Sequence, residues 1–178
     1  MRRLSPALVL FTLALFPVGN AQAQTGTYIT TADVEATEAA GLARLKEDSS
    51  RTISDIMIRH VDVGDEQLGV AVVQRTKRVA GGPLRGIAHV KLDEIYYVVS
   101  GQGTMVTGGP FTGVTETNSA LLGPMLAGTM EGGMSKKMGP GDIVIVPKGV
   151  PHGWSEITSD TISYLIFRTD PEKVMELK

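Results

Sequence analysis

Residues 81–101 read GGPLRGIAHVKLDEIYYVVSG, and residues 141–152 read GDIVIVPKGVPH. Both stretches contain runs of β-branched and aromatic residues bounded by glycine, a composition that favours strands ending in tight turns. The first stretch carries His89 and Glu94, and the second ends in His152. Two imidazoles and one carboxylate form a donor set that suits a divalent transition metal with open coordination positions.

Further strand-like segments lie on both sides of these stretches. The segments expected to form strands are residues 54–61, 68–75, 84–90, 95–99, 104–107, 143–146 and 162–168. Residues 101–103, Gly-Gln-Gly, supply a tight turn between two of them. Many short strands separated by glycine and proline turns indicate a single all-β sandwich or barrel.

The two stretches resemble the two signature motifs of the cupin superfamily, and the resemblance extends over about residues 68–168. The positions that agree with the motifs are Gly81, His89, Glu94, Gly101, Gly141, Pro147, Gly149 and His152. Two positions depart from them: Ile87 stands where the first motif has its first His, and Glu156 stands where the second has Asn. The chain is therefore identified as similar to small single-domain cupins.

The resemblance implies a double-stranded β-helix, or jelly-roll barrel, with a metal held by His89, Glu94 and His152. Ile87 has no donor atom, so the site either has three protein ligands or has lost its metal. Water, Lys91 and His60 are the candidates to complete the coordination. The metal would be iron, manganese, nickel, copper or zinc.

Strand periodicity adds four candidates for the lining of the pocket. Residues two apart on a strand face the same side, so Ile87 and Lys91 share a face with His89 if that strand continues. By the same rule Tyr96 shares a face with Glu94, and Tyr97 faces the opposite side. Trp154 is in phase with His152, and it either lines the barrel mouth or anchors the core.

The N-terminus has the three parts of a secretory signal peptide. Arg2 and Arg3 are followed by an apolar run at residues 7–16 and by Ala-Gln-Ala at residues 21–23. We therefore predict a signal peptide at residues 1–23, cleavage near Ala23, and a secreted or periplasmic protein. The apolar run is shorter than the ~20 residues that span a bilayer, and no cysteine is present to carry a lipid, so no stable membrane anchor is expected.

The rest of the chain divides into three further parts. Residues 24–53 are predicted as an extended lead and an amphipathic helix, which starts at the capping-box pattern Thr-Thr-Ala-Asp of residues 30–33. Residues 54–170 form the barrel, and residues 171–178 a short C-terminal helix or tail. Within the barrel, the glycine- and methionine-containing residues 108–138 are predicted as an inserted loop, which acts as a lid or contacts a second copy.

Composition excludes several classes of function. Lysine and arginine total 17 against 19 acidic residues, a net charge of −2 without a long basic run, so neither nucleic acid nor anionic membrane is an expected partner. The absence of cysteine rules out disulfides and thiolate ligands. A P-loop, a Rossmann fingerprint and a nucleophile elbow are also absent from the sequence after residue 23.

Two classes of function remain open. The resemblance implies either a metal-dependent enzyme that acts on a small molecule, such as a dioxygenase or isomerase, or a non-catalytic cupin that binds a small molecule without metal or has a structural role. It also implies a homodimer. Family membership does not decide between these functions.

Overall fold

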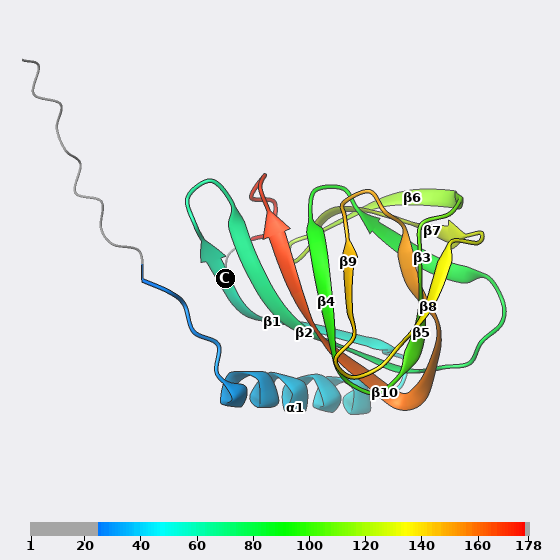
Figure 1. The fold of residues 1–178 in the computed structure, drawn as a ribbon, viewed down its shortest axis with the longest axis horizontal. Helices are drawn as coiled ribbons and strands as arrows, with labels where there is room; N and C mark the ends of the chain where they lie inside the picture. Colours follow the sequence, from blue (N-terminus) through cyan, green and yellow to red (C-terminus); the bar gives the residue numbers. More distant parts are fainter. Residues whose placement is uncertain (1–24, 177–178) are drawn as a thin grey trace, which may run out of the picture.

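The structure is a computed structural model that describes residues 25–176. The signal peptide predicted for residues 1–23 lies outside the described residues. Within residues 25–176 the chain forms one helix, α1 (Thr31–Glu47), and ten strands (Figure 1). The strands are β1 (Ile53–Asp62), β2 (Gln67–Arg78), β3 (Leu84–His89), β4 (Asp93–Ser100), β5 (Gly103–Thr107), β6 (Phe111–Ser119), β7 (Gly123–Met130), β8 (Met134–Met138), β9 (Ile143–Val146) and β10 (His152–Asp170).

Strand β10 joins the two halves of the fold. One half contains β1, β2, β4 and β9, and the other contains β3, β5, β6, β7 and β8. The first part of β10, from His152 to Ile157, pairs with β5 and contacts β3 at His152, and its second part, from Thr161 to Asp170, lies between β2 and β4. The register of β10 against β2 shifts between Ile157 and Thr161, so this long strand bends from one half to the other. The remaining pairs β1–β2, β3–β7, β7–β6, β4–β9 and β5–β8 are also antiparallel. The predicted all-β jelly roll is confirmed.

The hydrophobic core lies between the two halves and follows the alternation of the strands. In β4, Tyr96 and Val98 are buried, whereas Ile95 and Tyr97 are 37% and 39% exposed, so one of the two tyrosines faces the core, as predicted. The main core cluster consists of Val73, Tyr96, Val98, Met105, Met138, Val146, Trp154, Ile157, Ile162, Tyr164 and Ile166. Burial of this apolar surface is the main force that holds together a domain without disulfides.

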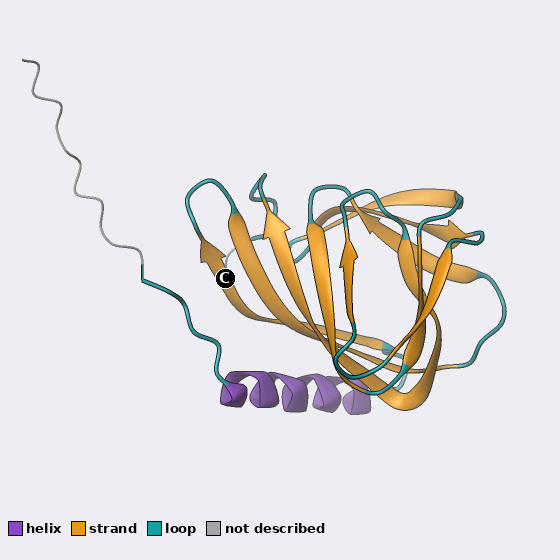
Figure 2. Cartoon of the chain, viewed as in Figure 1, coloured by secondary structure: helices purple, strands orange, loops and turns teal. Residues whose placement is uncertain are grey.

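Helix α1 begins at the predicted capping box and packs against the sheet (Figure 2). The backbone N–H of Asp33 donates to the Thr30 hydroxyl at 3.2 Å, and the backbone N–H of Thr30 donates to the Asp33 carboxylate at 2.9 Å. The helix buries Gly41 against the side chain of Gln74 in β2, where a Cβ atom would collide. None of the described helical residues forms a segment long and apolar enough to cross a membrane.

The prediction of an inserted loop at residues 108–138 is wrong. This segment forms β6, β7 and β8, and most of its glycines lie at or beside the turns between strands, for example Gly109 and Gly133 with φ of 84° and 103°. Strand β6 is exposed along most of its length and β8 is exposed except at Met138, so neither shows the apolar alternation that marks a half-buried strand. The methionines of this segment belong to strands, where Met130 and Met138 are buried and Met134 is 75% exposed.

Of the two alternatives predicted for the C-terminus, a short helix or a tail, residues 171–176 form the tail and no helix. Residues 171–176 form turns, and the Asp170 carboxylate accepts backbone hydrogen bonds from Val174 at 2.9 Å and Met175 at 2.7 Å. A side chain that bonds its own following backbone competes with the helical hydrogen bonds there. These bonds fold the tail back against the end of the barrel, where Met175 is 2% exposed.

Candidate metal centre

The structure brings His89, Glu94 and His152 together from three strands. His89 ends β3, Glu94 is the second residue of β4, and His152 begins β10. Their ligand atoms all lie within 4.8 Å of one another, and the three residues are only 3%, 1% and 3% exposed. Among the described residues, this is the one group of histidine and acidic side chains with the spacing of a metal site.

Strand pairing explains how residues so far apart in sequence meet. His152 on β10 lies opposite Ile87 on β3. Ile87 is two residues before His89, so the two side chains lie on the same face of β3. Close contact between these strands depends on Gly86, because a Cβ atom there would lie 2.9 Å from the His152 carbonyl oxygen. Glu94 lies opposite Arg168 at the other end of β10.

The distances fit a single ion. Glu94 Oε2 lies 3.2 Å from His89 Nε2 and 3.6 Å from His152 Nε2. Metal bonds of ~2.0–2.2 Å place neighbouring ligand atoms about 3.0–3.5 Å apart in octahedral or tetrahedral geometry. The two distances from Glu94 Oε2 therefore agree with binding of one transition metal.

His152 is held in the tautomer that a metal ligand requires. Its Nδ1 lies 3.0 Å from the Val150 carbonyl oxygen, which can only accept, so Nδ1 carries the proton. Burial lowers the pKa of His152 to about 4 although the Glu94 charge acts in the opposite direction, so the ring is neutral at neutral pH. The buried Nε2 therefore presents a lone pair into the cluster, and it has no hydrogen-bond partner among the described residues.

Glu94 stays ionised in this buried position. Burial alone would raise its pKa, but the neighbouring His89 and the positive charge of Arg168 outweigh burial and lower the pKa below its usual range. The hydroxyl of Tyr96 donates to Glu94 Oε2 at 2.7 Å, and Arg168 Nε donates to Oε1 at 2.9 Å. Burial raises the pKa of Tyr96, so this hydroxyl keeps its proton and remains a donor.

Sequence reasoning did not identify Arg168 and Asp55 as residues of the site. The Arg168 side chain is 1% exposed and lies between two carboxylates: Nε contacts Glu94, and Nη2 donates to Asp55 Oδ2 at 2.6 Å. Asp55 belongs to β1, more than a hundred residues earlier in the chain, and no motif includes either residue. The alternation of β10, which places Arg168 in phase with the apolar Tyr164 and Ile166, is the one sequence signal that could have identified it.

The other predicted residues fall into two groups. Ile87, which lies opposite His152, and Tyr96, which donates a hydrogen bond to Glu94, adjoin the cluster. Trp154 is 3% exposed and packs in the core, where its ring centroid lies 5.6 Å from that of Tyr164. Lys91 does not adjoin the cluster, because its ammonium pairs with Glu172 at 2.7 Å on the surface. His60 lies on β1, and it is not part of the donor group.

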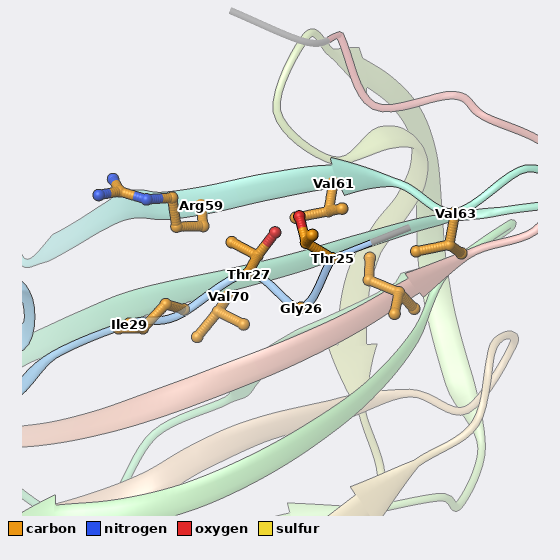
Figure 3. Close-up of a pocket in the computed structure, with 9 residues that line it drawn as sticks. Thr25, Gly26, Thr27, Ile29, Arg59, Val61, Val63 and Val70 are labelled. Atoms are coloured by element: carbon orange, nitrogen blue, oxygen red, sulfur yellow. The ribbon is translucent and has the colours of Figure 1, made fainter. Parts of the chain in front are cut away.

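Two surface cavities lie away from the cluster. One, of about 410 Å³, lies between the lead and the outer side of β1 and β2, and it is lined by residues including Thr25, Ile29, Arg59 and Val70 (Figure 3). The other, of about 460 Å³, follows β1 and includes Asp55 and His60. None of the three donor residues lines either cavity.

Comparison with solved structures finds many similar folds at low sequence identity. DMSP lyase DddQ from Ruegeria pomeroyi DSS-3 is 20% identical with a TM-score of 0.49, over 86% of this chain and 70% of that chain. KdgF from Halomonas sp. is 19% identical with a TM-score of 0.42, over 68% of this chain and 81% of that chain. CoII HppE in complex with Tris buffer is 14% identical with a TM-score of 0.43, over 66% and 52%. Similarity at this level identifies no activity.

The sequence itself matches a family profile. No curated protein matches the chain significantly. The profile of the family described as Cupin, however, matches residues 58–177, more than half of the 178 residues. That span includes every strand from β2 to β10 and all three donor residues. The chain therefore belongs to the cupin family.

Proposed function

We propose that this protein is a metal-dependent cupin that acts on a small molecule, with His89, Glu94 and His152 as the metal ligands. One observation carries the proposal: His152 Nε2 and Glu94 Oε2 lie 3.6 Å apart, and Nε2 of the neutral imidazole has no proton to donate, because the ring proton is on Nδ1. Two facing lone pairs in a buried site repel each other, and a cation between them turns that repulsion into binding.

The proposed site supports chemistry at a three-ligand centre. A bound transition metal would polarise a substrate carbonyl or enediol, or activate dioxygen, as in isomerases and dioxygenases. Ile87 supplies no donor on the side next to His152, which leaves coordination positions for substrate. Tyr96 donates to the ligand oxygen Glu94 Oε2, and this hydrogen bond orients the carboxylate in the site.

Metal content tests the proposal directly. We expect the protein, purified without chelator and without a metal-binding tag, to hold close to one equivalent of iron, manganese, nickel, copper or zinc. The His89→Ala/His152→Ala double variant should lose it, because two of three donors are gone. His60→Ala is the matched control, since His60 is the chain's only other histidine and lies outside the donor group. Equal metal content in the parent and the double variant would refute the assignment.

The alternative is a metal-free cupin that binds a small molecule or serves a structural role. It is favoured by the neighbours of Glu94, which stabilise the negative charge of its carboxylate without a metal. Arg168 and Tyr96 both donate hydrogen bonds to this carboxylate, and His89 Nε2 lies 3.2 Å away. Under this alternative, the parent would contain no metal even after incubation with each of the five ions, and its purified form would be examined for a bound organic molecule.

We further propose that the mature protein is secreted or periplasmic and forms a homodimer. Exposed apolar side chains on the adjacent strands β10, β4 and β9 form an outer apolar face without charged residues. In this face Ile95 lies opposite Ile145 and Phe167, and Tyr97 lies opposite Ile143. The exposed fractions are 66% for Ile145 and 62% for Ile143. An exposed apolar patch of this kind marks a contact surface, and its lack of charge lets it face a copy of itself.

The homodimer depends on the outer apolar face. Ile145→Asp should convert the protein to a monomer in analytical ultracentrifugation, because two carboxylates would be buried at the symmetric contact. Val114→Asp is the control, since Val114 is 43% exposed but lies on β6, away from this face. A monomeric parent, or a dimer that both substitutions leave intact, contradicts this interface.

A further inference from the structure

We propose that Arg168, held in place by Asp55, is a positioning residue that presents Glu94 to the metal through Oε2 alone. The inference rests on the proposed function, because it concerns how one of the three ligands is oriented. It assigns a role to two residues that lie outside both cupin motifs.

The two oxygens of Glu94 have different partners. Oε1 accepts the Arg168 Nε hydrogen bond at 2.9 Å, whereas Oε2 lies 3.2 Å from His89 Nε2 and 3.6 Å from His152 Nε2. A charge-assisted hydrogen bond of this kind is stronger than a neutral one, and here both side chains are 1% exposed. Rotation of the carboxylate to chelate a metal with both oxygens would break that bond.

Asp55 fixes the guanidinium from its other side. Arg168 Nη2 donates to Asp55 Oδ2 at 2.6 Å and Nη1 to Oδ1 at 3.3 Å, a two-point contact that a planar guanidinium makes with one carboxylate. Arg168 therefore cannot turn away from Glu94 without breaking two contacts with Asp55. The three side chains form a rigid series that runs from β1 through β10 to the ligand on β4.

The series carries a net charge of −1 before any metal binds, because two carboxylates, Asp55 and Glu94, share the single guanidinium of Arg168. Without Asp55, Arg168 would neutralise Glu94 alone, and the series would offer a metal no net negative charge. Loss of Arg168 would remove a positive charge from beside the metal, but it would also free Glu94 to rotate, and second-sphere substitutions of this type commonly weaken metal binding by about 10–100-fold.

The experiment measures Co²⁺ binding to the full protein, by competition with a chromophoric chelator and by the visible d–d spectrum of the bound ion. We expect the parent to bind one Co²⁺. Arg168→Met should bind it at least about tenfold more weakly and with a changed spectrum, because Glu94 no longer offers a single oxygen. Arg168→Lys, which keeps the charge but lacks the planar fork, should recover only part of the affinity. Arg59→Met, which removes a surface arginine that pairs with Asp33, should keep the parent spectrum.

Two results separate failure of the positioning role from failure of the metal site. A parent that binds Co²⁺ and an Arg168→Met protein with the same spectrum and affinity would overturn the positioning role and leave the site intact. A parent that binds no Co²⁺ would overturn both. Asp55→Asn provides a second test if Arg168→Met does not fold, because it removes the two-point contact while it leaves Arg168 beside Glu94. We expect a smaller change in the same direction, and a parent-like Asp55→Asn spectrum then counts against the proposal.

Discussion

Arg168→Met should lower the free energy of unfolding by about 3–5 kcal/mol, because removal of one member of a buried ion pair leaves an uncompensated charge behind. Here the remaining groups are Glu94, which is 1% exposed, and Asp55, whose side chain is 18% exposed. Arg168 itself is among the largest fully buried side chains of the described chain. Urea denaturation of the metal-free protein, followed by far-UV circular dichroism, measures the loss.

Lys91→Met serves as the control for this prediction. It also removes a cation that pairs with a carboxylate, but the Lys91 and Glu172 side chains are 35% and 46% exposed. Pairs of this kind contribute only about 0–1 kcal/mol in water. If Arg168→Met and Lys91→Met lower the free energy of unfolding by similar amounts, the buried series of charges is not a major source of stability.

Metal binding should raise the melting temperature of the parent by roughly 5–10 °C. An ion that binds only the folded state adds about 2.7 kcal/mol at a free concentration one hundred times its dissociation constant, and a domain of this size gains about 2–4 °C per kcal/mol. Addition of EDTA should reverse the shift. Thermal melts of the chelated protein with and without each divalent ion, at a fixed protein concentration, provide the measurement.

Single variants show whether the stabilisation comes from the proposed site. His152→Ala should abolish the metal-dependent rise in melting temperature, since it removes one of the three proposed metal ligands, whereas His60→Ala should keep it. A rise that persists in His152→Ala and disappears in His60→Ala would place the ion at the β1 cavity instead.

The part of the site that the sequence could predict is the part with fixed spacing. His89 and Glu94 lie on β3 and β4, which are consecutive in the chain but do not pair with each other, and His152 follows a proline- and glycine-containing turn. Motif spacing and strand alternation together were enough to predict that the three residues form one cluster. The strands around them also follow the alternation of apolar residues, and the capping box of α1 is a local signal. Local patterns predict local structure well.

Other features could not be predicted because they depend on contacts between distant strands. Arg168 meets Asp55 only after β10 has paired with β2 and β2 with β1, and only the alternation of β10 indicates from sequence that Arg168 is buried. Residues 111–119 show no apolar alternation because β6 is an exposed strand that pairs with β7 alone. Lys91 was predicted to share the face of His89 if that strand continued, but β3 ends at His89, and Lys91 pairs with Glu172.

The measurement that tests the central claim most directly is X-ray diffraction from crystals of the metal-loaded protein, with data collected on either side of the absorption edge of the bound ion. The account predicts one strong anomalous peak at about 2.0–2.2 Å from each of His89 Nε2, Glu94 Oε2 and His152 Nε2. An anomalous peak elsewhere on the chain would contradict the account. So would the absence of a peak at the cluster while the His89–Glu94 and Arg168–Glu94 contacts are intact.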